Sequence, residues 1–300
     1  MALIVQKYGG TSVKTVERVK HVAKHIESFR NAGHDLIITV SAPGGVTDKL
    51  TELTKQFDKR PPTREMDVLL STGEQISIAL LAMALNDLGI PSVSMTGSQM
   101  GIMTTDAHTK ARINYIKTDK IRKELDAGKV IIVAGFQGIT EDGEITTLGR
   151  GGSDTTAVAI AAAIKADLCE IYTDVDGVYT ADPRMVERTQ KLEKITHDEM
   201  LELASLGAKV LHPRSVEIAK IHNVKLCVRS SFDTTKEGTF VVANELLEKE
   251  FVVTGLACDQ KVAKIGIFDL EDKPGSATKV FQALADANIN VDMIVQSAMR

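Results

Sequence analysis

Short apolar runs alternate with longer amphipathic segments along most of the chain, and this alternation restricts the fold more than any other feature. The runs at 35–40, 129–136 and 168–173 are almost entirely apolar, which is typical of strands buried on both faces. The segments at 66–89 and 154–166 have the periodicity of helices. Apolar strands separated by helices predict an α/β fold in which helices cover both faces of a mostly parallel sheet.

Ligands bind such sheets beyond the carboxyl ends of the strands, so the loops at those ends are the expected place for a site. The loops are KYGGTS (7–12), SAPGGVTD (41–48), TTLGRGGSDTT (146–156) and DVDGVYTADPR (174–184). A single glycine loop is more often a tight turn, but four together favour backbone amides that surround phosphate oxygens, with Lys7 supplying a charge. The motifs G-x-x-x-x-G-K-[ST] and G-x-G-x-x-G are absent from the sequence, which disfavours P-loop and dinucleotide-binding enzymes.

Composition excludes several other classes of protein. With 300 residues, 43% hydrophobic and 25% charged, the chain resembles an ordinary globular protein with one large domain and part of another. A net charge of −4 without a basic stripe disfavours nucleic acid, and neither a membrane span nor a signal peptide is expected, so a cytoplasmic location is the default. Cys169, Cys227 and Cys258 lie far apart in apolar runs, so we expect small buried residues, not a disulfide framework or zinc site.

Six motifs, in the same order, resemble the amino acid kinase family and its aspartate kinases in particular. They are VQKYGGTSV (5–13), SAPGGVTDKL (41–50), STGEQIS (71–77), TTLGRGGSDTTAVAIAAAIKAD (146–167), EIYTDVDGVYTADPR (170–184) and GAKVLHPRS (207–215). The resemblance implies a three-layer αβα sandwich with a mostly parallel central sheet, as a catalytic domain over residues 1–245. It also implies that ATP and Mg²⁺ are used to convert L-aspartate to 4-phospho-L-aspartate, a step towards lysine, threonine and methionine.

The implied reaction agrees with the inventory of side chains. The side-chain carboxylate of aspartate has a pKa of about 3.9, so it is already ionised at neutral pH and needs no general base. The reaction instead needs two anions held in line and neutralisation of charge on the transferred phosphoryl group. By resemblance, Lys7 and Lys209 contact the phosphates and Asp154 orients them, as catalytic residues. Mg²⁺ arrives with ATP, so no dedicated metal site is expected.

The same resemblance implies two sets of binding residues. ATP is expected to contact Lys7, Gly9, Gly10, Ser41, Thr173, Asp174, Tyr179, Asp182, Arg184 and Lys209. Aspartate is expected to contact Ser41, Thr47, Glu74, Arg150, Gly152, Ser153 and Asp154. Arg150 can direct two N–H donors onto the α-carboxylate, while Glu74 can accept hydrogen bonds from the α-ammonium. Two alternatives stay open, because Glu74 also fits a capping box that begins at Ser71, and Lys209 also fits a solvated helix position.

Residues 246–300 resemble the first part of an ACT-type domain, an α+β ligand-binding module. The run at 262–268 alternates like a strand, the apolar stripe from Ala277 to Ala285 predicts a helix, and 289–295 predicts another strand. By resemblance, lysine and/or threonine is held by Asp272, Lys273, Pro274, Gly275, Ser276, Ala277, Asn288 and Asp292, and ACT units pair to form a homo- or hetero-oligomer. The second half of the module is missing, so we expect a fragment that has lost this feedback inhibition.

Three hypotheses about function remain open at this point. The first is aspartate kinase. The second is another member of the family, such as a glutamate or carbamate kinase, which would keep the phosphate loops but bind a different acceptor. The third is a ligand-sensing ACT module joined to an inactive kinase-like scaffold, and the intact lysines and acids disfavour it.

Overall fold

The computed structural model describes residues 1–57, 59–208, 210–243, 253–259, 262–268, 270, 273–287, 289, 291 and 294–295. The chain forms two compact units, Met1–Asp259 and Gln260–Arg300.

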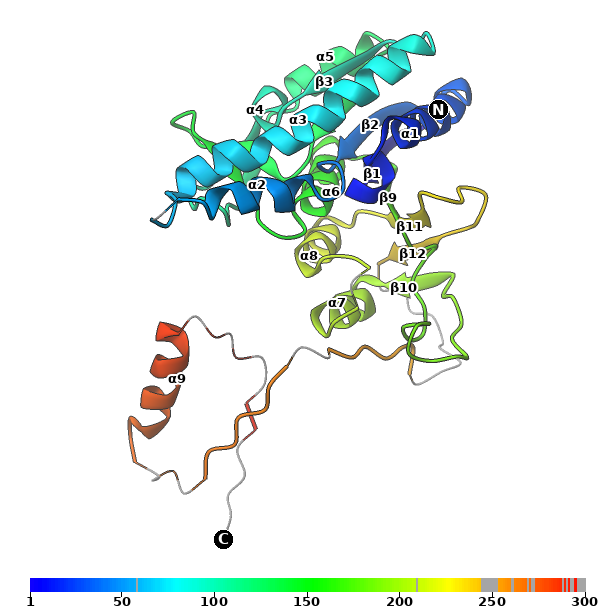
Figure 1. Ribbon diagram of the computed structural model, residues 1–300. Coiled ribbons are helices and arrows are strands. Elements are labelled where there is room, and N and C mark those ends of the chain that lie inside the picture. The colour runs from blue at the N-terminus through cyan, green and yellow to red at the C-terminus, as the bar shows by residue number, and fades with distance from the viewer. Residues whose placement is uncertain are drawn as a thin grey trace. The chain divides into compact units, whose positions relative to one another are not determined.

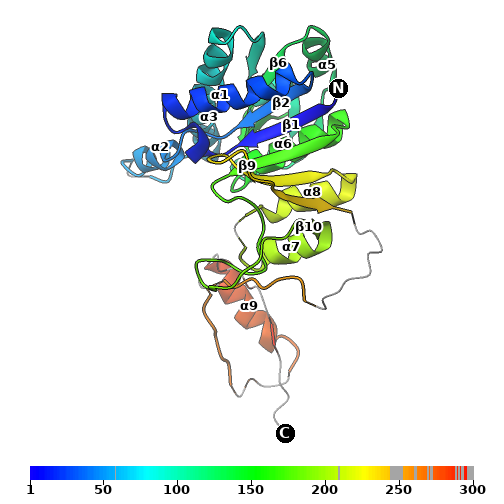
Figure 2. The same cartoon turned by 90° about the vertical axis from the view of Figure 1, so that its right-hand side faces the viewer.

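The first unit is built on an eight-stranded sheet (Figure 1). In spatial order, the strands are β10 (Lys194–Thr196), β12 (Thr239–Val242), β11 (Leu226–Ser230), β9 (Leu168–Thr173), β1 (Leu3–Tyr8), β2 (Asp35–Val40), β6 (Val130–Ala134) and β3 (Ser92–Met95). Neighbouring strands are parallel except β11 and β12, which confirms the predicted mostly parallel sheet. Since β1, β2 and β9 are parallel, their carboxyl ends lie at the same edge, on the side of α2 (Val46–Thr54) in Figure 2.

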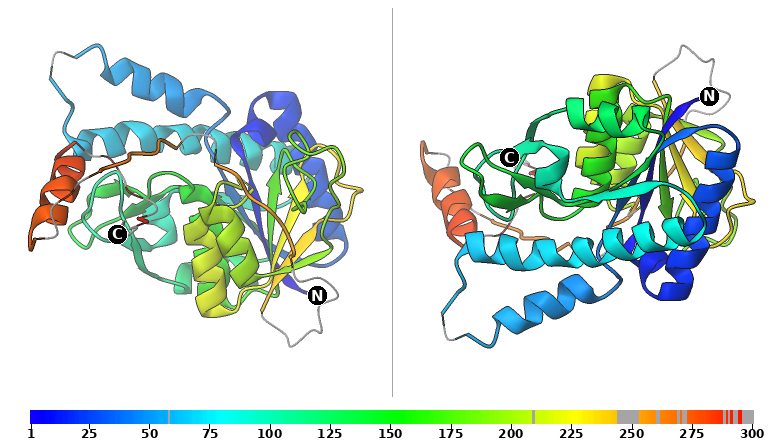
Figure 3. Two further views of the ribbon diagram at one scale, coloured as in Figure 1. Left: turned by 90° about the horizontal axis from the view of Figure 1, so that it is seen from below. Right: turned by 90° about the horizontal axis from the view of Figure 1, so that it is seen from above.

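Helices cover both faces of this sheet, as the sequence predicts (Figure 3). One face packs against α1 (Val16–Asn31) and α3 (Thr63–Asp87), and the other packs against α5 (Asp119–Asp126), α6 (Gly152–Ile164), α7 (His197–Ser205) and α8 (Pro213–His222). Successive residues of β1 alternate between the two cores: Ile4 and Tyr8 join the core under α1, whereas Val5 joins the core under α6. Strands buried on both faces explain the nearly continuous apolar runs.

A second, four-stranded sheet lies beside the first within the same unit. Its strands are β5 (Ile113–Ile116), β4 (Ile102–Thr104), β7 (Gln137–Ile139) and β8 (Ile145–Thr147), in that spatial order, and α4 (Gly97–Met100) precedes β4. The last strand of this sheet, β8, leads directly into α6 through residues 148–151, so the sheet positions the start of that helix.

Helix α3 stands out among the described helices for its length and apolar composition. By length and composition, its 25 residues are apolar enough to cross a membrane. Its side chains Ile78, Leu81 and Leu85 are nevertheless buried in the core that α3 forms with α1 and the sheet, as in the core helix of a globular domain. Cys169 and Cys227 are buried as predicted, but the prediction is wrong for Cys258, which is exposed.

The second unit contains the predicted helix, α9 (Ser276–Asp286). The predicted strand at 262–268 is wrong, because these residues have no strand structure. A strand needs a partner for its backbone N–H and C=O groups, and the described part of this unit offers none. Of the run at 289–295, the described positions are also not in a strand. Asp272, Asn288 and Asp292 lie outside the described residues.

Candidate active site

The loops after β1 and β2 are held together by backbone contacts. Residues Tyr8 and Val40 pair in parallel register, so both loops leave the sheet at one point. The Gly44 N–H then donates to the Gly10 carbonyl at 2.9 Å. A Cβ on Gly10 would come within 2.7 Å of the Ala42 carbonyl oxygen, so this close approach requires glycine. The glycines of the loop after β1 therefore allow backbone groups of the two loops to line one site.

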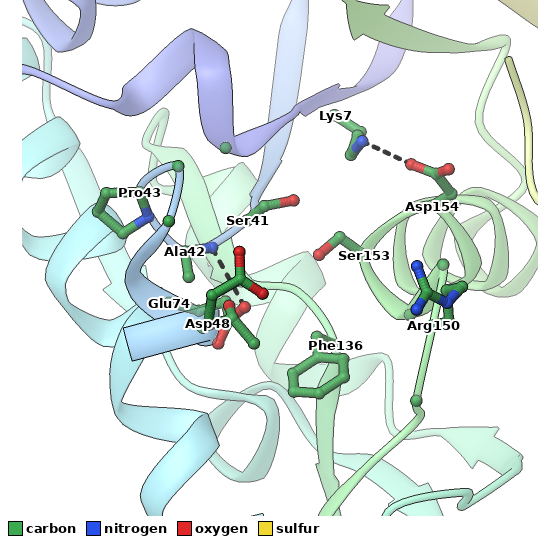
Figure 4. Close-up of a pocket in the computed structure, with 17 residues that line it drawn as sticks. Lys7, Ser41, Ala42, Pro43, Asp48, Glu74, Phe136, Arg150, Ser153 and Asp154 are labelled. Atoms are coloured by element: carbon green, nitrogen blue, oxygen red, sulfur yellow. Dashed lines mark hydrogen bonds and ion pairs between the residues drawn. The ribbon is translucent and has the colours of Figure 1, made fainter. Parts of the chain in front are cut away.

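A cavity of about 350 Å³ opens at this point of the first unit (Figure 4). The lining residues that the sequence predicted are Lys7, Gly10, Ser41, Thr47, Glu74, Arg150, Gly152, Ser153 and Asp154. The lining residues that the sequence did not predict are Ala42, Pro43, Gly44, Gly45, Asp48, Phe136, Gly149 and Gly151. All seven residues expected to bind aspartate therefore line one cavity, although they come from three separate motifs.

An ion pair lies at the edge of this cavity. The Lys7 ammonium, near the end of β1, is 2.6 Å from the Asp154 carboxylate in the first turn of α6. Both side chains are largely buried, with 11% and 14% of their surfaces exposed. The pair fixes the position of the Lys7 charge beside the amino end of α6, where the helix dipole also favours an anion.

Tight packing determines how α6 begins. Its N-cap, Gly151, has φ = +71°, and a Cβ there would come within 2.2 Å of the His212 ring. A Cβ on Gly152 would come within 2.7 Å of the Phe136 ring. These two glycines allow α6 to start against the walls of the cavity, and no other residue fits at Gly151 without strain.

Glu74 is a buried carboxylate on α3 with an unused oxygen. Its Oε1 accepts a hydrogen bond from the Ala42 N–H at 3.1 Å, but Oε2 has no hydrogen-bond partner among the described residues. The side chain is only 3% exposed, and this burial raises its pKa from 4.5 to about 7. Glu74 lies in the middle of α3, whose N-cap is Pro62, so the alternative of a capping box beginning at Ser71 is wrong.

Arg150 lies on the opposite side of the pocket from Glu74 (Figure 4). It is in the turn between β8 and α6, flanked by Gly149 and Gly151 with φ = +74° and +71°. These left-handed conformations let the chain reverse within a few residues. The cavity thus has a carboxylate from one helix facing a guanidinium from a separate turn, an arrangement that matches the two charged ends of an amino acid.

The other residues predicted to bind ATP lie outside the lining of this cavity. Gly9 immediately precedes the lining residue Gly10, and its N–H donates to the Tyr172 carbonyl at 3.3 Å. The remaining described positions, which lie at the end of β9 and in the loop that follows, are Thr173, Asp174, Tyr179, Asp182 and Arg184. Arg184 makes hydrogen bonds of 3.0 and 2.7 Å to Asp182, and this partner lowers the pKa of Asp182 to about 2. Lys209 lies outside the described residues, so its predicted role stays a prediction.

Some of the lining residues that the sequence did not predict belong to motifs that indicated a site, and others do not. Gly44, Gly45 and Asp48 belong to the SAPGGVTD loop, whose glycines had already indicated a site. Phe136 gave no such signal. It has φ = +70°, and its N–H donates to the Thr156 hydroxyl at 3.1 Å, so a local backbone conformation places its ring in the cavity.

Comparisons with known proteins agree with this geometry. Residues 2–230 match the model of the amino acid kinase family, and residues 265–300 match that of the ACT domain. An aspartate kinase of Pseudomonas fluorescens is 55% identical over 299 residues, which cover 99% of this chain and 72% of that protein. Both family matches follow the order of the two units along the chain.

Solved structures give the same result. The crystal structure of aspartate kinase from Synechocystis is 56% identical, with a TM-score of 0.73, and the match covers 81% of this chain and 40% of the other. The structure of E. coli aspartokinase III with aspartate and ADP is 26% identical, with a TM-score of 0.80, and the match covers 98% of this chain and 76% of the other. The chain therefore belongs to the amino acid kinase family and, within it, to the aspartate kinases.

Proposed function

We propose that the chain transfers the γ-phosphoryl group of ATP to the side-chain carboxylate of L-aspartate, which gives 4-phospho-L-aspartate and ADP. The observation that carries the proposal is the cavity itself. Glu74, with an unpartnered buried oxygen, and Arg150 lie on opposite sides of it, and the Lys7–Asp154 pair lies at its edge. A small amino acid with an additional anionic group matches this arrangement of charges.

Each end of the acceptor has a counterpart in the cavity. Oε2 of Glu74 can accept a hydrogen bond from the α-ammonium and thereby gain the partner that it lacks. Arg150 can hold the α-carboxylate with two parallel N–H donors. With both ends fixed, the side-chain carboxylate is the group left to meet the phosphoryl donor, and Thr47, Gly152 and Ser153 line the space around it.

The donor is proposed to bind where the glycine loops meet. Lys7 would supply the positive charge, with Gly9, Gly10, Ser41 and the amino end of α6 around the phosphates. The loop after β9 carries the residues proposed for the nucleoside, namely Thr173, Asp174, Tyr179, Asp182 and Arg184, and Lys209 is proposed as a second phosphate ligand. Asp154 would keep Lys7 oriented throughout the reaction.

Mg²⁺ is proposed to enter with ATP and to neutralise charge on its phosphates. The described residues contain no group of three His, Cys, Asp or Glu side chains suited to a metal ion. A Mg²⁺ ion that enters with ATP is held mainly by phosphates and water, with one or two carboxylates. Asp154, in the first turn of α6, and Asp174, in the loop after β9, are two of the carboxylates near the place where the phosphates would lie.

An assay of ADP release against a panel of acceptors tests this proposal. L-Aspartate, L-glutamate, L-asparagine and carbamate would each be offered with Mg·ATP, and hydroxylamine would trap any acyl phosphate as a hydroxamate. We expect ADP and hydroxamate in equal amounts with aspartate alone. Hydroxamate formed from glutamate or carbamate but not from aspartate would refute it, and ADP release that does not depend on any acceptor would also count against it.

The organisation of the chain is proposed along the same lines. Residues 1–245 would form the catalytic domain and residues 246–300 the ACT-type domain, which would bind lysine and/or threonine and mediate homo- or hetero-oligomerisation. The match to the ACT domain at 265–300 supports this assignment. We place the enzyme in the cytoplasm, where ATP and free aspartate are available.

A further inference from the structure

A buried aspartate, Asp67, ties together the two elements that carry Glu74 and Arg150. It lies on α3 with none of its surface exposed. Asp67 and Glu74 are seven residues apart, which places them on the same face of the helix, two turns from each other. Asp67 does not line the cavity, so any effect on the substrate must pass through its neighbours.

Asp67 holds two segments of the neighbouring small sheet. Its Oδ1 accepts a hydrogen bond of 2.5 Å from the hydroxyl of Thr147, the last residue of β8. Both of its oxygens accept from the Thr109 N–H, at 3.1 and 3.0 Å, and Oδ2 is 2.8 Å from Nδ1 of His108. Thr147 precedes Arg150 by only three residues, so Asp67 fixes the start of the turn that presents Arg150.

The backbone at Thr109 is strained. It has φ = +65°, a left-handed conformation that is unfavourable for a β-branched residue and persists only where surrounding contacts enforce it. Here, the Thr109 carbonyl oxygen would be 2.9 Å from a Cβ on Gly149, so the strained loop packs directly against the Arg150 turn. Asp67 is thus bonded to both segments that shape this turn.

Arg214, in the first turn of α8, holds the same turn through separate contacts. Its guanidinium donates to the carbonyl of Leu148 at 2.6 Å and to that of Ala111 at 3.1 Å. The Ala111 N–H in turn donates to the Thr147 carbonyl at 3.0 Å. Leu148 and Thr147 are consecutive, so the turn is anchored to α8 through Arg214 and to α3 through Asp67.

We propose that Asp67 is a positioning residue that sets the distance between Glu74 and Arg150, and thereby the fit of the amino acid acceptor. This inference rests on the proposed function, because it assigns Glu74 and Arg150 to the two ends of the acceptor. The Lys7 and Gly10 loops carry no hydrogen bond to Asp67 among the described residues, so their part of the nucleotide site has no direct tie to it. We therefore expect the loss of Asp67 to affect the acceptor much more than ATP.

The test compares Asp67→Asn with the wild type in steady-state kinetics with each substrate varied separately. We expect the Michaelis constant for aspartate to rise about tenfold or more, since small displacements of substrate-holding groups are costly, and that for ATP to change less than about twofold. The matched control is Ser77→Ala, a buried position on the same helix whose hydroxyl has no hydrogen-bond partner among the described residues. It should leave both constants unchanged.

Thr147→Val provides a second variant in case Asp67→Asn fails to fold. It removes one hydrogen bond to Asp67 with nearly the same shape, and we expect a smaller rise that is again confined to aspartate. A merely structural role would lower the melting temperature and the active fraction without changing the ratio of the two Michaelis constants. Folded variants with an unchanged ratio overturn the inference. If the wild type uses another amino acid as acceptor, only the proposed function is overturned. The ratio of the Michaelis constants for acceptor and ATP can then be measured with that acceptor, and the inference about Asp67 is still tested.

Discussion

The protonation of Glu74 should control aspartate binding between pH 6 and pH 8. Burial raises the pKa of Glu74 to about 7, and only the carboxylate can accept the α-ammonium as an ionic partner. With that pKa, about 9% of the free enzyme is ionised at Glu74 at pH 6 and about 91% at pH 8. We therefore expect kcat/KM for aspartate to rise about tenfold over this interval.

The turnover number should behave differently from kcat/KM. A bound ammonium next to Glu74 favours the charged form and lowers the pKa of its carboxyl in the complex. At saturating aspartate, kcat should therefore be nearly independent of pH over the same range. Burial, the main influence on His212, lowers the pKa of its ring and so favours the neutral form.

Glu74→Gln is the control for this prediction, because it preserves shape but does not titrate. At pH 8, its kcat/KM for aspartate should be about 10- to 150-fold below that of the wild type, the range for losing a hydrogen bond to a charged group. The assay is coupled ADP release at constant ionic strength with saturating Mg·ATP. A tenfold slope that survives in Glu74→Gln would refute the assignment of the titration to Glu74, and so would a flat wild-type profile.

Four further outcomes follow from the same contacts. Without aspartate, Glu74→Gln should be more stable than the wild type at high pH. The carboxyl of Glu74 ionises near pH 4.5 in the unfolded protein and near pH 7 in the folded protein, so the free energy of unfolding of the wild type falls by about 3 kcal/mol as pH rises through this window. Urea denaturation at pH 5 and pH 8 should show that the difference in stability between the two proteins grows with pH. Lys7→Ala should lower kcat by about 10²- to 10³-fold with little change in KM for aspartate, and near-normal turnover would exclude it from the phosphate site. Arg150→Lys should restore little of the kcat/KM for aspartate that Arg150→Ala loses, because an ammonium cannot form the bidentate hydrogen bonds of a guanidinium with a carboxylate. Equal kcat/KM for Arg150→Lys and the wild type would contradict this. Gly151→Ala should lower the unfolding free energy by at least about 1 kcal/mol, because of the left-handed backbone and the clash with His212, whereas an unchanged melting temperature would show that α6 can move.

The layers of the fold and the location of the site were predictable from local pattern. Strands such as β2 and β6 are apolar throughout because they are buried on both faces, and this alone indicates a parallel sheet. Parallel strands bring their carboxyl ends to one edge, so the glycine loops had to meet. The strand predicted at 262–268 failed for the complementary reason, because an alternating pattern does not supply the partner that a strand needs.

Residues that act through distant contacts were not predictable in this way. Asp67 reads in the sequence as one acid near the start of a helix, and its burial depends on Thr109 and Thr147, which are 42 and 80 residues away along the chain. Phe136 enters the cavity because of a positive φ that its sequence does not indicate. Glu74 was placed in the site by resemblance, and the residues alone left a helix cap as an alternative.

The apolar composition of α3 determines the state of the Glu74 carboxylate. A carboxylate in an exposed, polar helix would stay ionised and hydrated, and an ammonium would gain little by binding to it. In α3, apolar neighbours such as Ile78 and Leu81 remove water from the core that surrounds the helix, so Glu74 is left with a raised pKa and one unsatisfied oxygen. On the proposed function, the α-ammonium of the acceptor would supply both the charge and the hydrogen bonds that this oxygen lacks. On the proposed function, the apolar composition of α3 would favour an acceptor with an ammonium group, because the cost of burying an ionised Glu74 is relieved either by a proton or by a bound cation.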